Sequence, residues 1–180
     1  MKKIYLIIIC MLLLVGCNNK KEEDISFIMK FESEKAMLVF NINDLNSTNI
    51  FIDKFKYDES KVGKHDVVLN LYYSSTCRHC HALIEWLESV KDDYPYLKVV
   101  KKEASKNMDE YKLILNKMNI KDNHVPLTII GDSFYVGFSD SKKSFFDTLI
   151  KYYSTIESCD MVDAIINDKD IDNCKQINKK

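Results

Sequence analysis

The chain alternates between short apolar runs and segments in which apolar residues recur with a helical period, a pattern typical of a mixed α/β protein. Val67–Tyr73 is a nearly continuous apolar run, as expected of a central strand that is buried on both faces. In Ala82–Lys91, by contrast, Leu83, Leu87 and Val90 fall on one helical face and charged residues take the other. A central strand followed directly by an amphipathic helix is therefore predicted.

The same pattern continues towards the C-terminus with further strands and helices. Proline fits at the start of a strand because it lacks a backbone N–H, and Gly131-Asp132-Ser133 is a tight-turn signal between two apolar runs. In chain order the predicted elements are a strand at Leu97–Lys102, a helix at Met108–Ile120, a strand opened by Pro126, a hairpin strand at Phe134–Phe138 and a helix capped by Asp140 or Ser141. This order predicts one mixed sheet with flanking helices.

The segments on either side of this region are less regular. Ala36–Ile42 and Ile50–Phe55 both have the composition of strands, so residues 25–65 are predicted to form a β-rich N-terminal extension without chemistry of its own. Ser154–Lys180 is an acidic and polar tail, in which Met161–Asn167 is predicted to be helical.

Composition and charge exclude one class of partner. The 180 residues suffice for one domain with an extension, and the hydrophobic (46%) and charged (29%) shares are those of a folded protein. With 26 basic and 27 acidic residues the formal net charge is −1, which leaves no electrostatic footprint for nucleic acid. No nucleic-acid partner is therefore expected.

The N-terminus has the organisation of an export signal. Lys2 and Lys3 form a short basic region, and Ile4–Val15 is an apolar run that is too short for a comfortable transmembrane helix. The run ends in Gly16-Cys17, which resembles the bacterial lipobox, where cleavage would leave Cys17 as the first residue with a diacylglycerol on its sulfur. An ordinary secretory peptide cut elsewhere, or an uncleaved anchor, is the alternative.

A lipid on Cys17 would place the protein at the bacterial cell membrane, facing the extracytoplasmic side, where disulfides persist. Residues 18–24 are all polar or charged and are predicted to form a tether. The predicted organisation is a signal peptide (1–16), a lipid-attached tether (17–24), the N-terminal extension (25–65), a core (66–153) and a C-terminal tail (154–180).

The cysteine count agrees with export. Of six cysteines, one leaves with the signal peptide and Cys17 takes the lipid, so that four remain: Cys77, Cys80, Cys159 and Cys174. Four thiols allow three pairings. Proximity along the chain favours Cys77–Cys80 as a labile pair and Cys159–Cys174 as a structural disulfide.

The Cys77-Arg78-His79-Cys80 motif lies where the predicted central strand passes into its helix, and the hydroxyls of residues 74–76 can cap that helix. Two thiols at this spacing, at a helix start, are typical of a redox-active pair. With His81 the motif also fits C-x-x-C-H haem attachment, which would make the protein an electron carrier with His81 as iron ligand. A zinc site is a third alternative, although no second closely spaced pair of ligands is present.

From Asp66 to Tyr153 the order of elements resembles the thioredoxin fold. The residues that carry the resemblance are the Cys77–Cys80 motif after an apolar strand, Val125-Pro126 before a later strand, and the glycines around the hairpin, Gly131 and Gly137. The resemblance implies an α/β protein with a central mixed sheet and flanking helices, to which the β-rich extension is added. It also implies a thiol–disulfide oxidoreductase that uses neither a cofactor nor a metal.

The resemblance assigns roles to individual residues. Cys77 is expected to be the exposed attacking sulfur, and Cys80 to resolve the mixed disulfide. The helix N-terminus, Arg78 and a protonated His79 are expected to favour the Cys77 thiolate. The proline of the family is cis, so Val125-Pro126 is expected to hold the backbone open for pairing with a substrate chain.

Three residues bear on the direction of electron transfer. His79, immediately before the second cysteine, is more typical of the oxidising and isomerase motifs of the family. Leu71 and Thr76 stand where thioredoxins have a buried Asp and a Trp. These departures favour the oxidase or isomerase direction over the reductase direction. The expected partners are exported cysteine-containing proteins and a redox partner in the membrane; a non-catalytic lipoprotein on this scaffold is the remaining alternative.

Overall fold

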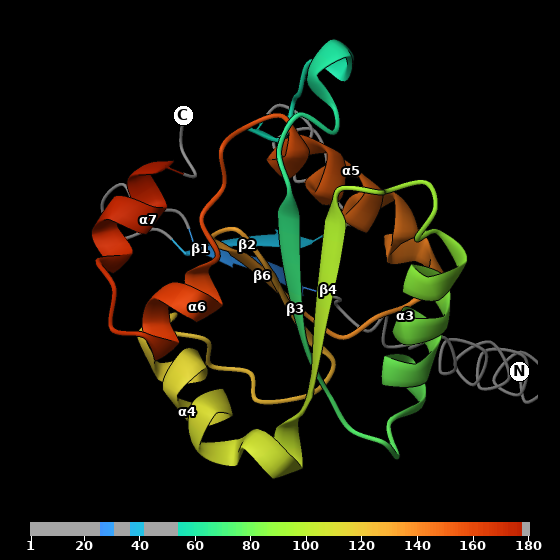
Figure 1. The fold of residues 1–180 in the computed structure, drawn as a ribbon. Coiled ribbons are helices and arrows are strands. Elements are labelled where there is room, and N and C mark those ends of the chain that lie inside the picture. The colour runs from blue at the N-terminus through green and yellow to red at the C-terminus, as the bar shows by residue number, and fades with distance from the viewer. Residues whose placement is uncertain (1–25, 31–36, 42–53, 178–180) are drawn as a thin grey trace, which may run out of the picture.

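A mixed sheet with helices on both faces forms the centre of the molecule (Figure 1). The computed structural model describes residues 26–30, 37–41 and 54–177. Within these residues no helix is long and apolar enough to cross a membrane. The predicted signal peptide, the tether and Cys17 lie outside the described residues.

The sheet has four strands in the order β4-β3-β5-β6. The strands are β3 (Val67–Tyr73), β4 (Leu97–Glu103), β5 (Leu127–Ile130) and β6 (Ser133–Val136). β3 pairs in parallel with β4 and antiparallel with β5, and β5 pairs antiparallel with β6. A parallel pair needs a crossover connection, which the helix after β3 supplies, whereas β5 and β6 are joined by a tight turn.

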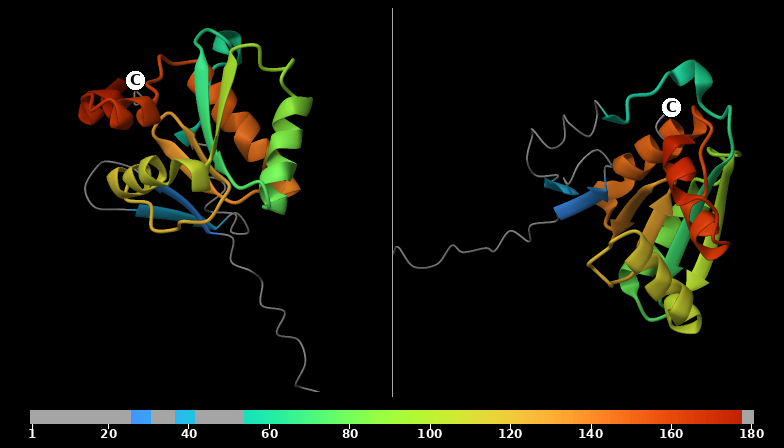
Figure 2. Two further views of the ribbon diagram at one scale, coloured as in Figure 1. Left: turned by 60° about the horizontal axis from the view of Figure 1, so that its bottom comes forward. Right: turned by 90° about the vertical axis from the view of Figure 1, so that its left-hand side faces the viewer.

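Helices cover the two faces of the sheet in pairs (Figure 2). One face packs against α3 (Arg78–Ser89) and α5 (Lys143–Ser154), and the other packs against α4 (Met108–Lys117) and α6 (Met161–Ile166). Alternate residues of β3 enter the two cores, with Leu69 and Leu71 on the α3 side and Tyr72 on the α4 side. This double burial explains why β3 is apolar almost throughout.

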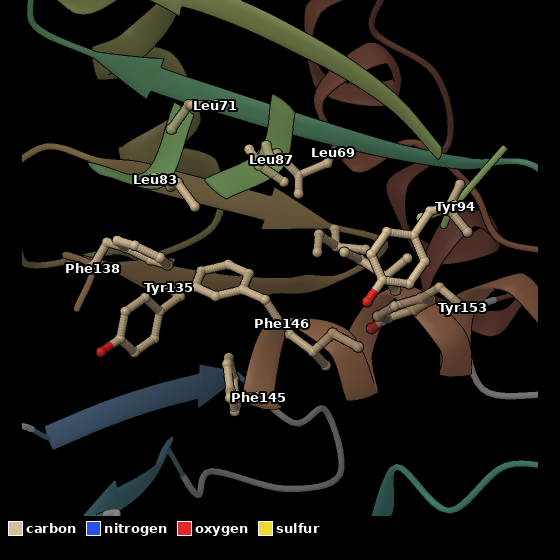
Figure 3. Packing of buried hydrophobic residues seen from close by; sticks show 14 of the residues in the cluster. Leu69, Leu71, Leu83, Leu87, Tyr94, Tyr135, Phe138, Phe145, Phe146 and Tyr153 are labelled. Carbon is tan, nitrogen blue, oxygen red and sulfur yellow. The ribbon is translucent and has the colours of Figure 1, made fainter. Parts of the chain in front are cut away.

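The core on the α3 side is rich in aromatic rings. Figure 3 shows Tyr135, Phe138 and Phe146 gathered on this side, near the leucines of α3. The ring centroid of Phe146 lies 5.6 Å from that of Tyr135 and 5.8 Å from that of Phe138. Such tilted and edge-to-face pairs add about 0.5–1.5 kcal/mol each to the area they bury. The packing fixes α5 against the strands that frame the Cys77–Cys80 motif.

The predicted thioredoxin-like arrangement of strands and helices is confirmed by this topology. The predicted strands and helices of residues 66–153 are all present, with boundaries shifted by a few residues. The prediction for the start of α5 is wrong: neither Asp140 nor Ser141 caps this helix. A 3-10 turn, η3 (Asp140–Lys142), comes between, and Lys142 is the first flanking residue of α5, without a side-chain capping bond.

The N-terminal extension is described in part. β1 (Ser26–Lys30) pairs antiparallel with β2 (Met37–Asn41), and β1 runs beside β6. β2 matches the strand predicted at Ala36–Ile42, whereas β1 was not predicted. The strand predicted at Ile50–Phe55 falls mostly outside the described residues, and its last two residues, Lys54 and Phe55, are not in a strand. A 3-10 turn, η1 (Glu59–Lys61), precedes β3.

The C-terminal tail folds onto the α4 face. Its predicted helix is α6, and a further helix that was not predicted, α7 (Ile171–Ile177), follows. The side chain of Asp160 accepts the N–H groups of the first turn of α6 and also the Nδ2 hydrogen of Asn70, a buried residue of β3, at 2.9 Å. This contact ties the tail to the central strand.

Candidate active site

The Cys77–Cys80 motif lies at the C-terminal end of β3, where the chain turns into α3. β3 ends at Tyr73, and Cys77 is the N-cap of α3 with an extended backbone (φ −88°, ψ 113°). The Cys77 sulfur accepts the backbone N–H of Cys80 at 3.2 Å. A sulfur in this position takes one of the N–H groups that a helix start otherwise leaves unpaired, and negative charge is favoured there.

The hydroxyls of residues 74–76 do not cap the helix, so that prediction is wrong. Ser74 Oγ lies 3.1 Å from Thr76 Oγ1. Ser75 Oγ donates to Glu103 Oε1 at 2.9 Å, which ties the loop before Cys77 to the end of β4. The hydroxyls therefore shape the loop and leave the capping position to the sulfur.

The two sulfurs of the motif, which are both free thiols, differ in access to solvent. Cys77 is half-buried, whereas Cys80 has none of its surface exposed. Burial raises the pKa of the Cys80 thiol to about 12, and a hydrogen bond to Cys77 and the negative charge of Cys77 act in the same direction. A backbone hydrogen bond from Ser74 acts in the opposite direction. At neutral pH Cys80 is therefore a protonated thiol, so Cys77 is the sulfur available to a disulfide.

The segment before β5 lies against the motif. The Val125–Pro126 peptide bond is cis, and the Cys77 thiol contacts the Val125 carbonyl oxygen at 3.5 Å. Pro126 is buried, and its carbonyl accepts the N–H of Gly137 at 2.8 Å. The fold thus brings together two segments that are 48 residues apart in the sequence.

Arg78 and His79 occupy the first turn of α3 and are exposed. All residues of α3 are described, and its first turn contains no acidic residue. The Cys77 sulfur, rather than a carboxylate, therefore occupies the position where the helix N-terminus favours negative charge.

The C-x-x-C-H motif does not have the geometry for haem attachment. Covalent attachment requires both thiols to reach the porphyrin, but Cys80 is fully buried within the fold. The His81 Nε2 atom, which would face the iron, lies 2.8 Å from the carbonyl oxygen of Ser75. Among the residues that the structure describes, no three His, Cys, Asp or Glu side chains are grouped in a way that would hold a metal ion.

Leu71 is fully buried, and Thr128 is its register partner on β5. The Thr128 hydroxyl is buried as well and has no hydrogen-bond partner among the described residues. The side of β3 that faces α3 therefore has no carboxylate at Leu71 to take up a proton.

Two residues of the site were missed in the sequence. Glu103 at the end of β4 binds Ser75 and also pairs with Lys106, at 2.6 Å. Tyr111 on α4 donates its hydroxyl hydrogen towards the carbonyls of Asn123 and His124, just before the cis peptide. Tyr111 lies on the buried face of α4, and no local signal in the sequence indicates a partner for its hydroxyl.

Cys159 and Cys174 form a disulfide, with a Cα–Cα distance of 5.3 Å, which is the pairing that proximity favours. The bond joins the segment before α6 to α7. It belongs to the C-terminal tail, and the two thiols of the site take no part in it.

No protein-family model and no curated protein sequence matches the chain. Among solved structures, it is similar to the oxidised form of mitochondrial thioredoxin 3 from Saccharomyces cerevisiae. The identity is 16%, the alignment covers 52% of this chain and 84% of that one, and the TM-score is 0.36. Identity and score are both low, and the function proposed below rests on the geometry of the site.

Proposed function

We propose that the protein is an oxidoreductase that catalyses thiol–disulfide exchange through Cys77 and Cys80. The observation that carries the proposal is the asymmetry of the pair. Cys77 is half-buried at the N-terminus of α3, whereas Cys80 is fully buried and its pKa is raised to about 12. Cys77 is thus placed to react with a client disulfide, whereas Cys80 remains a protonated thiol until the mixed disulfide has formed.

The exchange begins with attack of the Cys77 thiolate on one sulfur of a client disulfide. A bond forms between Cys77 Sγ and that sulfur, the client S–S bond breaks, and the electron pair leaves on the second client sulfur, which takes up a proton. Cys80 then loses its proton to water and attacks Cys77 Sγ, and the first client sulfur leaves with its electron pair. The client is reduced and the pair is oxidised; the reverse sequence oxidises a client dithiol.

The causes of the raised Cys80 pKa support this order of events. While Cys77 is a thiolate, its charge and its hydrogen bond add to the effect of burial on Cys80. In a mixed disulfide Cys77 carries no charge, so both contributions disappear and the Cys80 pKa falls. Formation of the mixed disulfide therefore makes the resolving thiol easier to ionise.

We also propose that the protein acts on exported proteins at the bacterial cell membrane, held there by a lipid on Cys17. The support is the predicted signal peptide, in which a short basic region and an apolar run end at Gly16-Cys17. Labelling of cells with a radioactive fatty acid, with Cys17→Ala as the control, tests the anchor. Label that persists in the variant would contradict it.

The proposed direction is oxidation or isomerisation of clients. It is supported by His79 before the resolving cysteine and by the apolar Leu71. A reduction potential between about −180 and −120 mV, measured against glutathione, is expected for such enzymes, whereas about −270 mV is typical of thioredoxin. A value near the latter would assign the protein to reduction.

The activity is tested with the full chain in detergent, using insulin reduction and dithiothreitol oxidation. Cys77→Ser is expected to abolish both reactions, and Cys80→Ser is expected to accumulate a mixed disulfide that runs as a larger species on a non-reducing gel. His65→Ser serves as the control, because His65 lies just before β3 and outside the motif, and this variant should keep both activities. Full activity of Cys77→Ser would refute the assignment, and an inactive wild-type chain would favour a non-catalytic lipoprotein.

A further inference from the structure

We propose that Tyr111 is a positioning residue that holds the backbone before Pro126 in place for a polypeptide client, an inference that rests on the proposed function. Tyr111 lies on α4, outside the Cys77–Cys80 motif, and is 4% exposed. Its hydroxyl oxygen lies 3.0 Å from the Asn123 carbonyl oxygen and 3.1 Å from that of His124. A single O–H group is thus shared between two consecutive peptide carbonyls.

These two carbonyls belong to a connection without regular structure. Residues 120–124, between α4 and β5, are in neither a helix nor a strand. The next residue is Val125, whose carbonyl oxygen lies 3.5 Å from Cys77 Sγ. The Tyr111 hydroxyl therefore fixes the two peptide units that immediately precede the one facing the attacking sulfur.

The ring of Tyr111 is itself held in place. It packs against the ring of Tyr72 on β3, with the centroids 5.3 Å apart. The Tyr72 hydroxyl donates to Glu110 Oε1 at 2.5 Å, and Lys102 Nζ binds the same oxygen at 2.6 Å. The central strand and β4 thus fix the position of the ring, so the hydroxyl acts as a rigid support for the connection.

The hydroxyl stays a hydrogen-bond donor over the working range of pH. Burial, followed by the charges of Asp122 and Cys80, raises the pKa of Tyr111 to about 12. The Tyr111 hydroxyl therefore remains able to donate to the Asn123 and His124 carbonyls at neutral pH.

A polypeptide client and a small disulfide differ in how much of this arrangement they need for the exchange. A small disulfide needs only the sulfur of Cys77. A polypeptide client that pairs with the backbone edge at Val125 needs this edge of the protein to be held in a fixed position. Loss of the Tyr111 hydroxyl is therefore expected to weaken polypeptide binding and to leave exchange with small reagents unchanged.

The test uses Tyr111→Phe in the full chain, which removes only the hydroxyl. KM for a disulfide-containing polypeptide is expected to rise about fivefold to tenfold, as for the loss of one hydrogen bond, with kcat nearly unchanged. The rate with a small aromatic disulfide is expected to stay within twofold of the wild-type rate. The reduction potential is expected to be unchanged. Hydrogen exchange of residues 123–125 should become faster.

Tyr94→Phe is the matched control. Tyr94 is also buried, and its hydroxyl donates to Asp147 Oδ1 at 2.5 Å, but it precedes β4 at the other end of the sheet. An unchanged polypeptide KM in Tyr111→Phe, or a parallel loss with the small disulfide, would overturn the positioning role. A wild-type chain that exchanges with neither substrate would overturn the proposed function itself, and the two failures are thus distinguishable.

Discussion

The protonation of Cys80 provides a sharp test of the site, because it can be read by alkylation with iodoacetamide. A thiol whose pKa is about 12, instead of the ordinary 9.0, is ionised in about one molecule in 100,000 at pH 7, against about one in 100. Only the thiolate reacts. The burial of Cys80 and its contact with Cys77 therefore lower its reactivity about a thousandfold through ionisation alone, before any effect of access.

The assay measures labelling of each cysteine in the reduced chain by mass spectrometry from pH 6 to pH 10. Cys77 is expected to be labelled first at pH 7. The rate at Cys80 should rise about tenfold for each pH unit through pH 10, because its thiolate fraction does so. This slope is independent of access, which lowers the rate equally at every pH. Both residues should react at similar rates in urea.

A variant separates the two causes of the shift. Cys77→Ser removes the charge and the sulfur hydrogen bond but leaves Cys80 buried, so the Cys80 pKa should fall and its labelling at pH 7 should become faster. Equal labelling of Cys77 and Cys80 at pH 7, or a Cys80 rate that levels off below pH 10, would refute the reasoning.

Two further predictions concern stability. The Lys106 and Ser75 hydrogen bonds lower the pKa of Glu103, so its stabilising effect is fully present above about pH 4.5 and is lost as pH falls through the lowered folded value. Glu103→Gln should lower the urea midpoint at pH 7 but not at pH 2; a difference that grows on acidification would contradict this. Replacement of Cys159 and Cys174 by alanine opens a loop of 15 residues and should cost about 3 kcal/mol of unfolding free energy. Exchange at the active pair should persist in the folded variant, and its loss there would give the disulfide a role in the site.

The sequence predicted the core of the fold because each element there has one dominant periodicity. The run at Val67–Tyr73 is apolar throughout because both of its faces are buried, and α3 is amphipathic because one face packs on the sheet. The N-terminal extension and the C-terminal tail do not have a single dominant periodicity of this kind. β1 and α7 are short, and neither carries a period long enough to stand out from its surroundings.

Local signals were less reliable at the ends of elements. Hydroxyl residues at 74–76 are good helix caps in general, but the cap is the residue at which the backbone is extended just before the first helical turn. Where β3 ends and how Ser75 binds Glu103 decide that this residue is Cys77. In the proposed function, a sulfur in that place is more than a cap, because it is also the atom that attacks the client disulfide.

The order of elements within residues 66–153, the spacing of the two thiols and the proline that precedes β5 could therefore be predicted from the sequence. These are properties of neighbouring residues, and periodicity or a short motif records them. The three-dimensional structure was needed to show that Cys80 is fully buried, that the Val125 carbonyl contacts Cys77 and that the Tyr111 hydroxyl donates to carbonyls of the connection between α4 and β5. Burial and hydrogen bonding between segments depend on how helices pack on the sheet, and no local pattern of residues records that packing.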